Sequence, residues 1–200
     1  LSQLTNLESL SLHNNQISDI TPLASLTKLK NLELAKNRIT DVSPLSSLTS
    51  LRSLMMHENS ITNIGPLSSM TNLTTIWLNH NKITSISPLS SLTYLTHIDI
   101  PGNQINDISP LLKLTGLRSL DLRENQISDI SSLSSLIKLE WLELSNNQIS
   151  NVSSLSPLVK LETLDLAKNL ITDDSPLSSL TRLKTINLEG NPIATGTATT

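Results

Sequence analysis

Two tryptophans are the side chains of this chain that are best suited to binding another molecule. Trp77 and Trp141 stand in a sequence of 200 residues in which Phe, Trp and Tyr together make up 2%. Tryptophan is enriched at the centres of protein–protein interfaces, because its large ring buries much apolar surface. Histidine and methionine occur near Trp77, as Met55, His57, His80 and His97. These residue types predict recognition of a protein partner.

Acidic residues recur at a fixed interval of 22 positions, as Asp99, Asp121, Glu143 and Asp165. If one interval is one structural repeat, these carboxylates lie on neighbouring strands ~4.8 Å apart, where like charges repel. Arg123 is the internal cation that could offset them, and a basic partner or a bound cation is the external one. A solvated face that tolerates the repulsion is the alternative. Nucleic acid is not an expected partner, because this face is acidic and the net charge is -3.

Metal binding and catalysis are the other kinds of chemistry that these residue types can support. The four histidines are His13, His57, His80 and His97. His57 and His80 could approach each other across neighbouring repeats, but His97 lies two strands from His57, about 10 Å or more away. The chain has no Cys, and its pattern offers no nucleophile turn or pocket for a catalytic triad. We therefore expect no metal, no cofactor and no enzymatic activity.

An internal repeat defines the elements that must position these side chains. Asparagine recurs every 22 residues without an insertion, at Asn15, Asn37, Asn59, Asn81, Asn103, Asn125, Asn147, Asn169 and Asn191. The aliphatic residues keep the same register, which gives the pattern LxxLxLxxNxIxxIxPLxxLT. This pattern is typical of a leucine-rich repeat. We expect about nine such repeats over residues 1–193 and a disordered tail over residues 194–200, where the period fails.

Each repeat predicts one strand, one turn and one short helical segment. Leu10 and Leu12 alternate with polar residues, as in a strand that buries one face. Thr21-Pro22 predicts an N-cap followed by proline at the first helical position. About four residues then remain before the next strand, which favours 3-10 turns over long helices. Asp174 replaces an aliphatic residue of the pattern, so we expect the last of these turns to be loose and solvated.

The fold class that follows is α/β: a right-handed solenoid with a curved parallel β-sheet on the concave face and short 3-10 turns on the convex face. Function is then expected at strand positions that point outward and do not repeat. Met55, His57, Trp77, His80 and His97 are predicted to form one patch beside the acidic stripe. A large side chain that merely covers neighbouring strands is the alternative reading of Trp77. The candidate partner-binding residues are Met55, His57, Trp77, His80, His97, Asp99, Asp121, Arg123, Trp141 and Glu143.

The repeat resembles that of a known family. Residues 15–23, NQISDITPL, recur as NQISDI at residues 125–130. With Leu26-Thr27, this segment resembles the 22-residue repeat of bacterial internalins, which are surface proteins that bind host receptors. The resemblance implies a gently curved solenoid whose concave sheet engages a protein partner, in a secreted or cell-surface protein. It does not carry over individual contact residues, since these lie at the variable positions. Absence of Cys fits a bacterial surface and a reducing cytoplasm alike, so a cytoplasmic location is the alternative.

The sequence therefore predicts non-enzymatic protein–protein recognition through the concave face. The rivals are a rigid spacer or stalk, which the regular Ser-Pro-Leu-Ser-Ser-Leu turns favour, and a regulatory module of a larger intracellular protein. No apolar run approaches the ~18 residues of a membrane span, so membrane insertion is not expected. No capping unit is visible at Leu1, which leaves end-to-end self-association open. The glycosylation sequons at Asn72 and Asn151 are attributed to chance in a chain rich in Asn, Ser and Thr.

Overall fold

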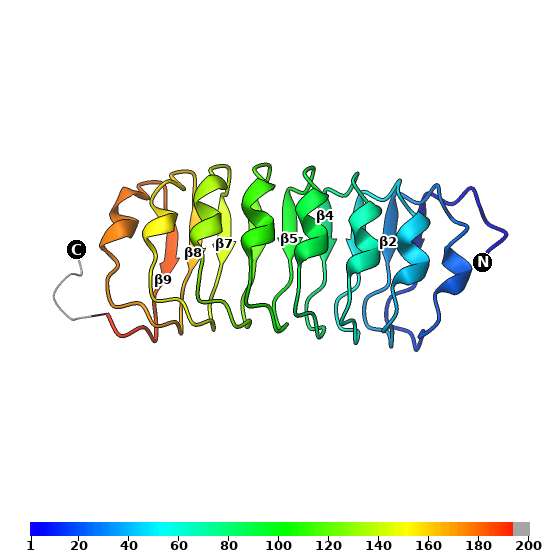
Figure 1. Ribbon diagram of the computed structural model, residues 1–200, viewed down its shortest axis with the longest axis horizontal. Helices are drawn as coiled ribbons and strands as arrows, with labels where there is room; N and C mark the ends of the chain where they lie inside the picture. Colours follow the sequence, from blue (N-terminus) through cyan, green and yellow to red (C-terminus); the bar gives the residue numbers. More distant parts are fainter. Residues whose placement is uncertain (194–200) are drawn as a thin grey trace.

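A single parallel sheet forms one side of the molecule. The computed structural model describes residues 1–193 and contains nine strands in this part, which pair in sequence order (Figure 1). From the first strand to the eighth, every residue of a strand is paired with the residue 22 positions later, so the register never slips. The strands are β1 (Ser9–Ser11), β2 (Asn31–Glu33), β3 (Ser53–Met55), β4 (Thr75–Trp77), β5 (His97–Asp99), β6 (Ser119–Asp121), β7 (Trp141–Glu143), β8 (Thr163–Asp165) and β9 (Thr185–Asn187).

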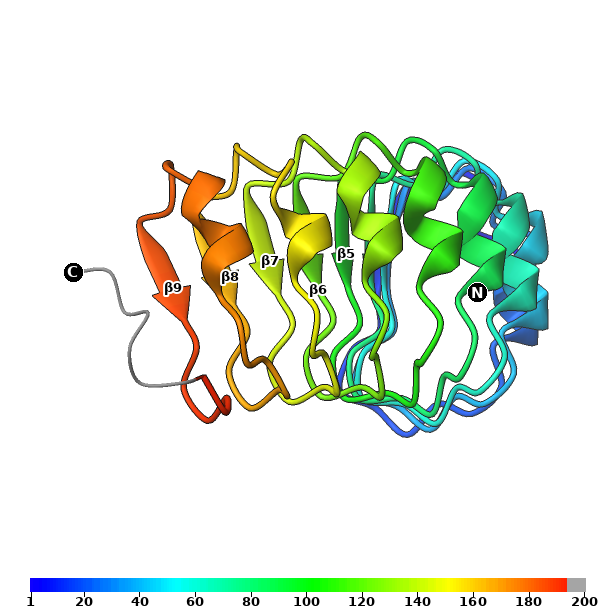
Figure 2. The same cartoon turned by 60° about the vertical axis from the view of Figure 1, so that its left-hand side comes forward.

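Short 3-10 turns form the opposite side. Figure 2 shows the array curving, with the strands along one side and the helical turns along the other. The turns are η1 (Thr21–Leu23), η2 (Ser43–Ser47), η3 (Gly65–Ser69), η4 (Ser87–Ser91), η5 (Ser109–Lys113), η6 (Ser131–Ser135), η7 (Ser153–Leu155) and η8 (Ser175–Ser179). The predicted right-handed solenoid with a concave parallel sheet and convex 3-10 turns is confirmed. The expected tail over residues 194–200 lies outside the described residues, and the proposed extent of the array stays a prediction.

The entry to each 3-10 turn differs from the sequence expectation in one respect. The predicted capping residue Thr21 lies inside η1, and the side-chain cap comes from two residues earlier: Asp19 Oδ1 accepts the Thr21 N–H at 2.8 Å. The same bond joins Asp41 to Ser43. The hydroxyl and then the backbone N–H of Thr21 hold the pKa of the Asp19 carboxyl below the ordinary value, and the backbone N–H and then the hydroxyl of Ser43 do the same for Asp41. A short acidic side chain thus satisfies an N–H that would otherwise lack a partner.

The last turn, η8, is as regular as the others, so the expected loosening at Asp174 is wrong. Its backbone bonds form whatever side chain is present: Leu177 N–H donates to Asp174 O at 2.9 Å, and Leu180 N–H donates to Leu177 O at 3.0 Å. Asp173 Oδ1 also accepts the Ser175 N–H at 2.9 Å. The Asp174 side chain lies half-buried rather than in the core.

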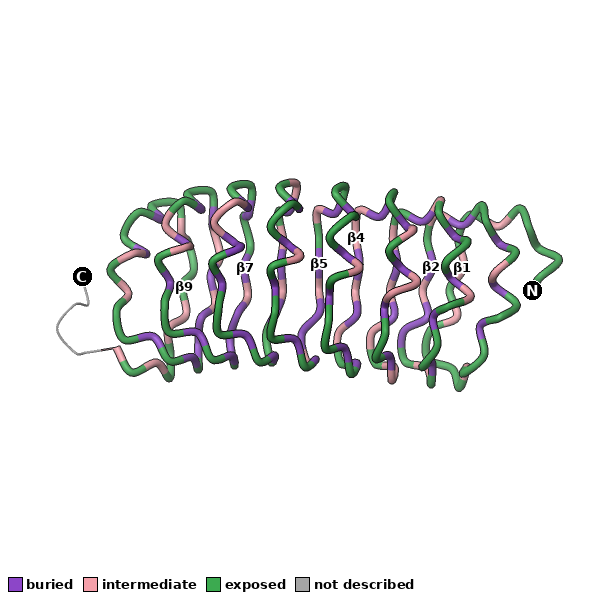
Figure 3. The backbone as a smooth tube through the Cα atoms, in the orientation of Figure 1, coloured by how far each residue is buried: buried purple, intermediate pink, exposed green. Residues whose placement is uncertain are grey.

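The core is a continuous aliphatic column between the sheet and the turns. Buried segments alternate with exposed ones along the whole tube in Figure 3, and the buried cluster runs from Ile20 to Leu180. Burial is weaker at both ends, where Leu1 and Leu4 are exposed and Ile186 is 45% exposed. These apolar ends are the surfaces that self-association would use, and self-association stays a prediction.

The repeated asparagines, which follow the strands, hydrogen-bond to backbone groups of neighbouring repeats. Asn103 Nδ2 donates to Leu78 O, Ile100 O and Pro101 O at 3.1–3.2 Å, and its Oδ1 accepts the Ile83 N–H at 3.0 Å. One amide thus satisfies four backbone groups in two repeats. The equivalent residues Asn81, Asn125, Asn147 and Asn169 are buried and bonded in the same way.

The helical segments of the described residues are short 3-10 turns. None of those in residues 1–193 has the length and the apolar composition that crossing a bilayer requires.

Candidate functional site

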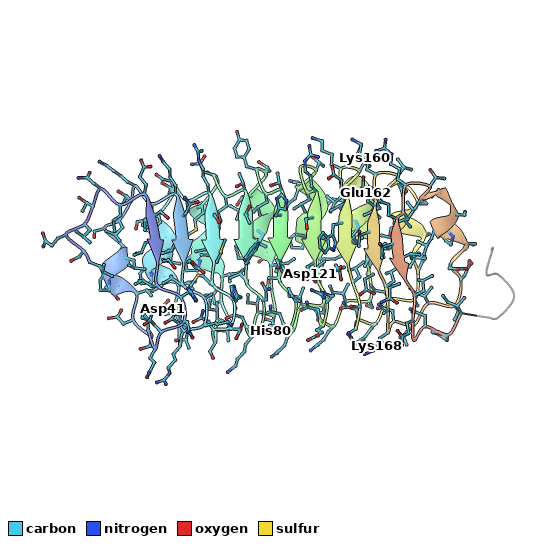
Figure 4. All side chains as sticks on the ribbon, turned by 180° about the vertical axis from the view of Figure 1, so that it is seen from behind. Asp41, His80, Asp121, Lys160, Glu162 and Lys168 are labelled. Carbon is cyan, nitrogen blue, oxygen red and sulfur yellow. The ribbon has the colours of Figure 1, made fainter. Side chains whose placement is uncertain are left out.

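The outward-facing residues of the sheet form columns, because each strand places equivalent side chains side by side. The last position of each strand brings Met55 beside Trp77, Trp77 beside Asp99, and Asp99 beside Asp121. Glu143 and Asp165 continue this column on β7 and β8. Asp121 is seen over the middle of the sheet in Figure 4. The structure therefore brings the acidic stripe and Trp77 together in one row, as the repeat predicts.

The two tryptophans have different surroundings. Trp141 begins β7, is 52% exposed, and donates its indole Nε1 hydrogen to Glu143 Oε1 at 2.7 Å. Trp77 ends β4 and is half-buried, and its ring centroid lies 6.4 Å from that of His57 at an interplanar angle of 48°. An exposed indole and a half-buried one thus project from the same face of the sheet.

His57 and His97 lie on either side of Trp77. His57 is half-buried, its Nδ1 has no hydrogen-bond partner, and burial lowers its pKa, which favours the neutral ring. His97 begins β5, is exposed, and has Nδ1 2.8 Å from Thr96 Oγ1. The predicted grouping of Met55, His57 and Trp77 is present, with His97 one strand beyond.

His80 lies apart from these residues, in the turn that follows β4. Its backbone is left-handed, with φ of 51°, and its ring packs against Gly102 of the next repeat. Figure 4 shows His80 at the loops along one edge of the sheet, away from the strands. The position of His80 in the repeat therefore places it among the turns at the edge of the sheet, and not in the column of strand residues that contains Trp77.

Gly102 and His80 form a pair whose coupling can be measured. Gly102 has φ of +64°, and a Cβ built there would lie 2.3 Å from His80 Nδ1. We expect Gly102→Ala to lower the free energy of unfolding by about 2 kcal/mol, through left-handed strain and displacement of the ring. In a His80→Ala background only the strain remains, and the cost should fall to about 1 kcal/mol. Urea unfolding of the four proteins measures both costs, and equal costs in the two backgrounds would disprove the contact.

Arg123 offsets part of the repulsion within the acidic stripe. Its Nη2 lies 2.6 Å from Asp121 Oδ2, its Nε donates to both carboxylate oxygens at 3.0 and 3.1 Å, and its Nε is also 3.4 Å from Glu143 Oε2. Three charged groups thus share one network. Arg123 is paired with two acidic residues, Asp121 and Glu143. Its single positive charge is smaller than the negative charge of the stripe, which therefore keeps an excess of negative charge.

Asp99 and Asp165 are the acidic residues of the stripe that this network leaves out; Asp165 Oδ1 accepts the Ala167 N–H at 2.9 Å, and Asp99 differs from it. Asp99 Oδ1 is buried without a hydrogen-bond partner. Burial, and then the negative charge of Asp121, raise the pKa of Asp99 to about 6, against the lowering effects of Asn79, Arg123 and His80. At pH 7 the folded protein therefore holds a carboxylate whose ionisation its surroundings oppose.

This burial makes a prediction for the pH dependence of stability. The folded pKa of about 6 lies above the unfolded value near 4, so the folded state binds more protons between these pH values. Ionised Asp99 therefore destabilises the fold above pH 6, and that penalty disappears as the pH falls toward 4. Because the side chain is partly exposed, solvent screening reduces the penalty to about 1 kcal/mol. Asp99→Asn should stabilise the protein by this amount at pH 7.5 in urea unfolding. A stability difference between the two proteins that stays constant from pH 7.5 to 4.5 would contradict the assignment.

Two hollows open between the side chains of this face. The central hollow has a volume of about 290 Å³ and is lined by Trp77, His97, Ile98, Asp99, Ser119, Asp121, Arg123 and Trp141. The adjoining hollow, on the other side of Trp141, has a volume of about 410 Å³ and is lined by His97, Arg118, Ser119, Glu140, Trp141, Glu162 and Thr163. Trp141 separates two hollows, each of which is lined by two acidic residues and one arginine.

Sequence reasoning missed several of these lining residues. Ser119 lines both hollows, because it is a small residue in the column between His97 and Trp141. Arg118 and Glu140 precede their strands, and Arg118 Nη1 lies 2.6 Å from Glu140 Oε1. A small residue between two large ones in one column is the signal in the sequence that could have located the hollow.

Cofactor and metal binding were tested on the same residues. In the part of the chain that the structure describes, no group of three or more His, Cys, Asp or Glu side chains could hold a metal ion. The sheet face offers aromatic surfaces, the Asp99 carboxylate that is not paired with Arg123, and open hollows, which are features of a binding surface.

A nine-stranded parallel solenoid with a repeating Leu and Asn framework defines the class of leucine-rich-repeat proteins. The family model for leucine-rich repeats (two copies) matches residues 5–47, 27–69, 49–91, 93–135, 137–179 and 159–196. The chain belongs to the leucine-rich-repeat family and has the internalin-like form of the repeat. The search of curated proteins finds no match for it.

Solved structures agree with this assignment. Internalin C2 of Listeria monocytogenes is 34% identical with a TM-score of 0.89, over 94% of this chain and 83% of that one. The internalin InlF of the same species is 32% identical with a TM-score of 0.80, over 96% of this chain and 64% of that one. A leucine-rich-repeat protein of Leptospira interrogans is 30% identical with a TM-score of 0.90, over 96% and 51%. This chain thus spans between half and about four fifths of these relatives.

Proposed function

We propose that this chain is a non-enzymatic recognition module whose concave sheet face binds a protein partner. Leucine-rich-repeat domains are generally protein-interaction modules, and internalin-like folds are typically non-enzymatic. The observation that carries the proposal is the exposed Trp141 of β7 and the half-buried Trp77 of β4, which line one hollow on a face that otherwise presents mostly polar side chains. Solvent-exposed tryptophan beside a hollow is typical of an interface centre.

The candidate residues have different roles in this proposal. Trp77 and Trp141 provide apolar contact area, with Met55, His57 and His97 extending the surface around Trp77. Asp99, Asp121, Glu143 and Arg123 provide charge. His80 lies in the adjoining turn and would contact a partner that reaches the edge of the sheet. The partner is therefore expected to carry a basic surface over the stripe.

A rigid spacer is the rival function, and the uniform 22-residue register favours it. A spacer needs no exposed indole and no carboxylate held against its ionisation, whereas a binding surface uses both. The regulatory module of a larger intracellular protein would also bind through this face. The resemblance to internalins supports action at a bacterial surface or in secreted form, which we include in the proposal.

The test of this function compares the two faces of the protein. Trp77→Ala removes a large ring from the concave face, and Ile137→Ala removes an exposed aliphatic side chain just after η6, away from the strands. Immobilised wild type and both variants are used to capture proteins from the native surroundings, and affinities of the captured protein are then measured by calorimetry. We expect Trp77→Ala to weaken binding about 30-fold or more and Ile137→Ala to have little effect. Equal affinities of all three proteins would favour the spacer.

A further inference from the structure

The central hollow exists because of the order of side chains along the strands. Large side chains surround it, with Trp77 from β4, His97 from β5 and Trp141 from β7, while β6 contributes the small Ser119. Ile98, Asp99, Asp121 and Arg123 complete the lining. The indoles of Trp77 and Trp141 thus lie at opposite ends of a polar gap. The volume of this gap, about 290 Å³, is at the lower limit for small-molecule pockets, about 300 Å³. This size suits a single side chain of a partner.

The charge of the hollow selects the kind of side chain. Among the lining residues, Asp99 and Asp121 carry two negative charges and Arg123 carries one positive charge, which leaves a net charge of -1 at pH 7. Glu143, which does not line the hollow, lies 3.4 Å from Arg123 and adds a further negative charge nearby. Arg123 is held by its bonds to Asp121 and stays at the side of the hollow. Asp99 also lines the hollow and is not bonded to Arg123. Its Oδ1 is buried, so a cation in the hollow would meet the part of the carboxylate that faces the gap.

We propose that the central hollow holds one arginine side chain of the protein partner, with its guanidinium stacked on an indole and hydrogen-bonded to the Asp99 carboxylate. This inference rests on the proposed function and specifies which chemistry the concave face recognises. A cation is attracted to the face of an indole ring and to a carboxylate at the same time. Both kinds of group line this hollow.

Arginine fits these surroundings better than lysine. The guanidinium is planar and stacks on an aromatic ring, whereas the ammonium group of lysine is compact and strongly hydrated. Arginine also remains charged at every pH at which the protein is folded. An acidic or neutral side chain would leave the negative charge of Asp99 without compensation.

The two indole N–H groups allow a direct test, because the chain has two tryptophans and each gives its own NMR signal. Four probes are titrated into the isotopically labelled chain: the N-acetyl amides of arginine, lysine, citrulline and norleucine. Citrulline has nearly the shape of arginine without its charge. We expect the arginine probe to shift both indole signals and to bind at least about fivefold more tightly than citrulline. Lysine is expected to lie between these two.

Three variants separate the hollow from the general field of the stripe. Asp99→Asn removes the carboxylate that is not paired with Arg123. Ser119→Leu fills the hollow and leaves both tryptophans in the sequence. Asp165→Asn is the matched control, because it removes the same charge from the same column at a residue that does not line the hollow. We expect the first two to weaken arginine binding at least about fivefold and Asp165→Asn to change it less than about twofold.

The outcomes are distinct from those of the proposed function. Equal binding of arginine and citrulline, or equal loss in Asp99→Asn and Asp165→Asn, would overturn the arginine site. A partner whose affinity depends on Trp77 but not on Asp99 or Ser119 would preserve the recognition function and also overturn this inference. Backbone signals away from the hollow report whether each variant is folded.

Discussion

Asn103→Ala is expected to lower the free energy of unfolding by about 2 kcal/mol, because it leaves one buried N–H without an acceptor and removes one hydrogen bond from each of three carbonyls. The Ile83 N–H loses its acceptor. The carbonyls of Leu78, Ile100 and Pro101 each lose one of two donors and keep the bonds from Asn81 Nδ2, Asn125 Nδ2 and His80 N–H. Asn103 is 8% exposed, so water does not readily replace the amide. The shift of the urea unfolding midpoint at constant slope measures this cost.

Two further variants make the result specific. Gln104→Ala changes the exposed neighbour, whose backbone N–H still donates to Ile83 O, and should leave the midpoint unchanged. Asn103→Asp keeps an acceptor for the Ile83 N–H but places a carboxylate against three carbonyl oxygens. We expect it to destabilise at least as much as alanine, by about 2 kcal/mol or more. A midpoint for Asn103→Ala equal to that of Gln104→Ala would show that the asparagines do not stabilise the array.

Leu120→Ala, at the buried middle position of β6, is expected to cost about 3 kcal/mol, because it leaves a cavity between packed repeats. Leu120 has no exposed surface, and its strand neighbours Ile98 and Leu142 are fixed by the register on both sides. Calorimetric or urea unfolding measures this loss.

The same strand position at the end of the array provides the control. Ile186 of β9 pairs with Leu164 on one side and is 45% exposed. Ile186→Ala should therefore lower the free energy of unfolding by only about 1 kcal/mol, because it removes a smaller apolar area from contact. If Leu120→Ala and Ile186→Ala lowered the free energy of unfolding by similar amounts, packing against a repeat on each side would not be what makes Leu120 more stabilising than Ile186.

The repeat allowed the fold to be predicted almost completely, because one register applies to every strand. The alternation around Leu10 and Leu12 predicts the strands, and the remaining length predicts 3-10 turns. The details that differ depend on local backbone bonds. Asp19 rather than Thr21 provides the cap, and η8 forms although Asp174 replaces an aliphatic residue.

The candidate site was predicted less completely, because it depends on where long side chains point. The register places Trp77 beside Asp99, but it does not show that Trp141 bonds to Glu143 or that Arg123 bonds to Asp121. The place of His80 over Gly102 depends on a left-handed turn that spacing alone does not reveal. The binding roles of these residues stay predictions.

The unbroken register also bears on how such a protein can change over evolutionary time. Asn103-Gln104 and Asn125-Gln126 are the same dipeptide at equivalent places in neighbouring repeats. A recombination event that joined Asn103 directly to Gln126, or that copied the block between them, would create a junction whose neighbours already exist elsewhere in the array. The chain can therefore gain or lose whole strands of its recognition surface in single genetic steps, while the framework that supports them is preserved.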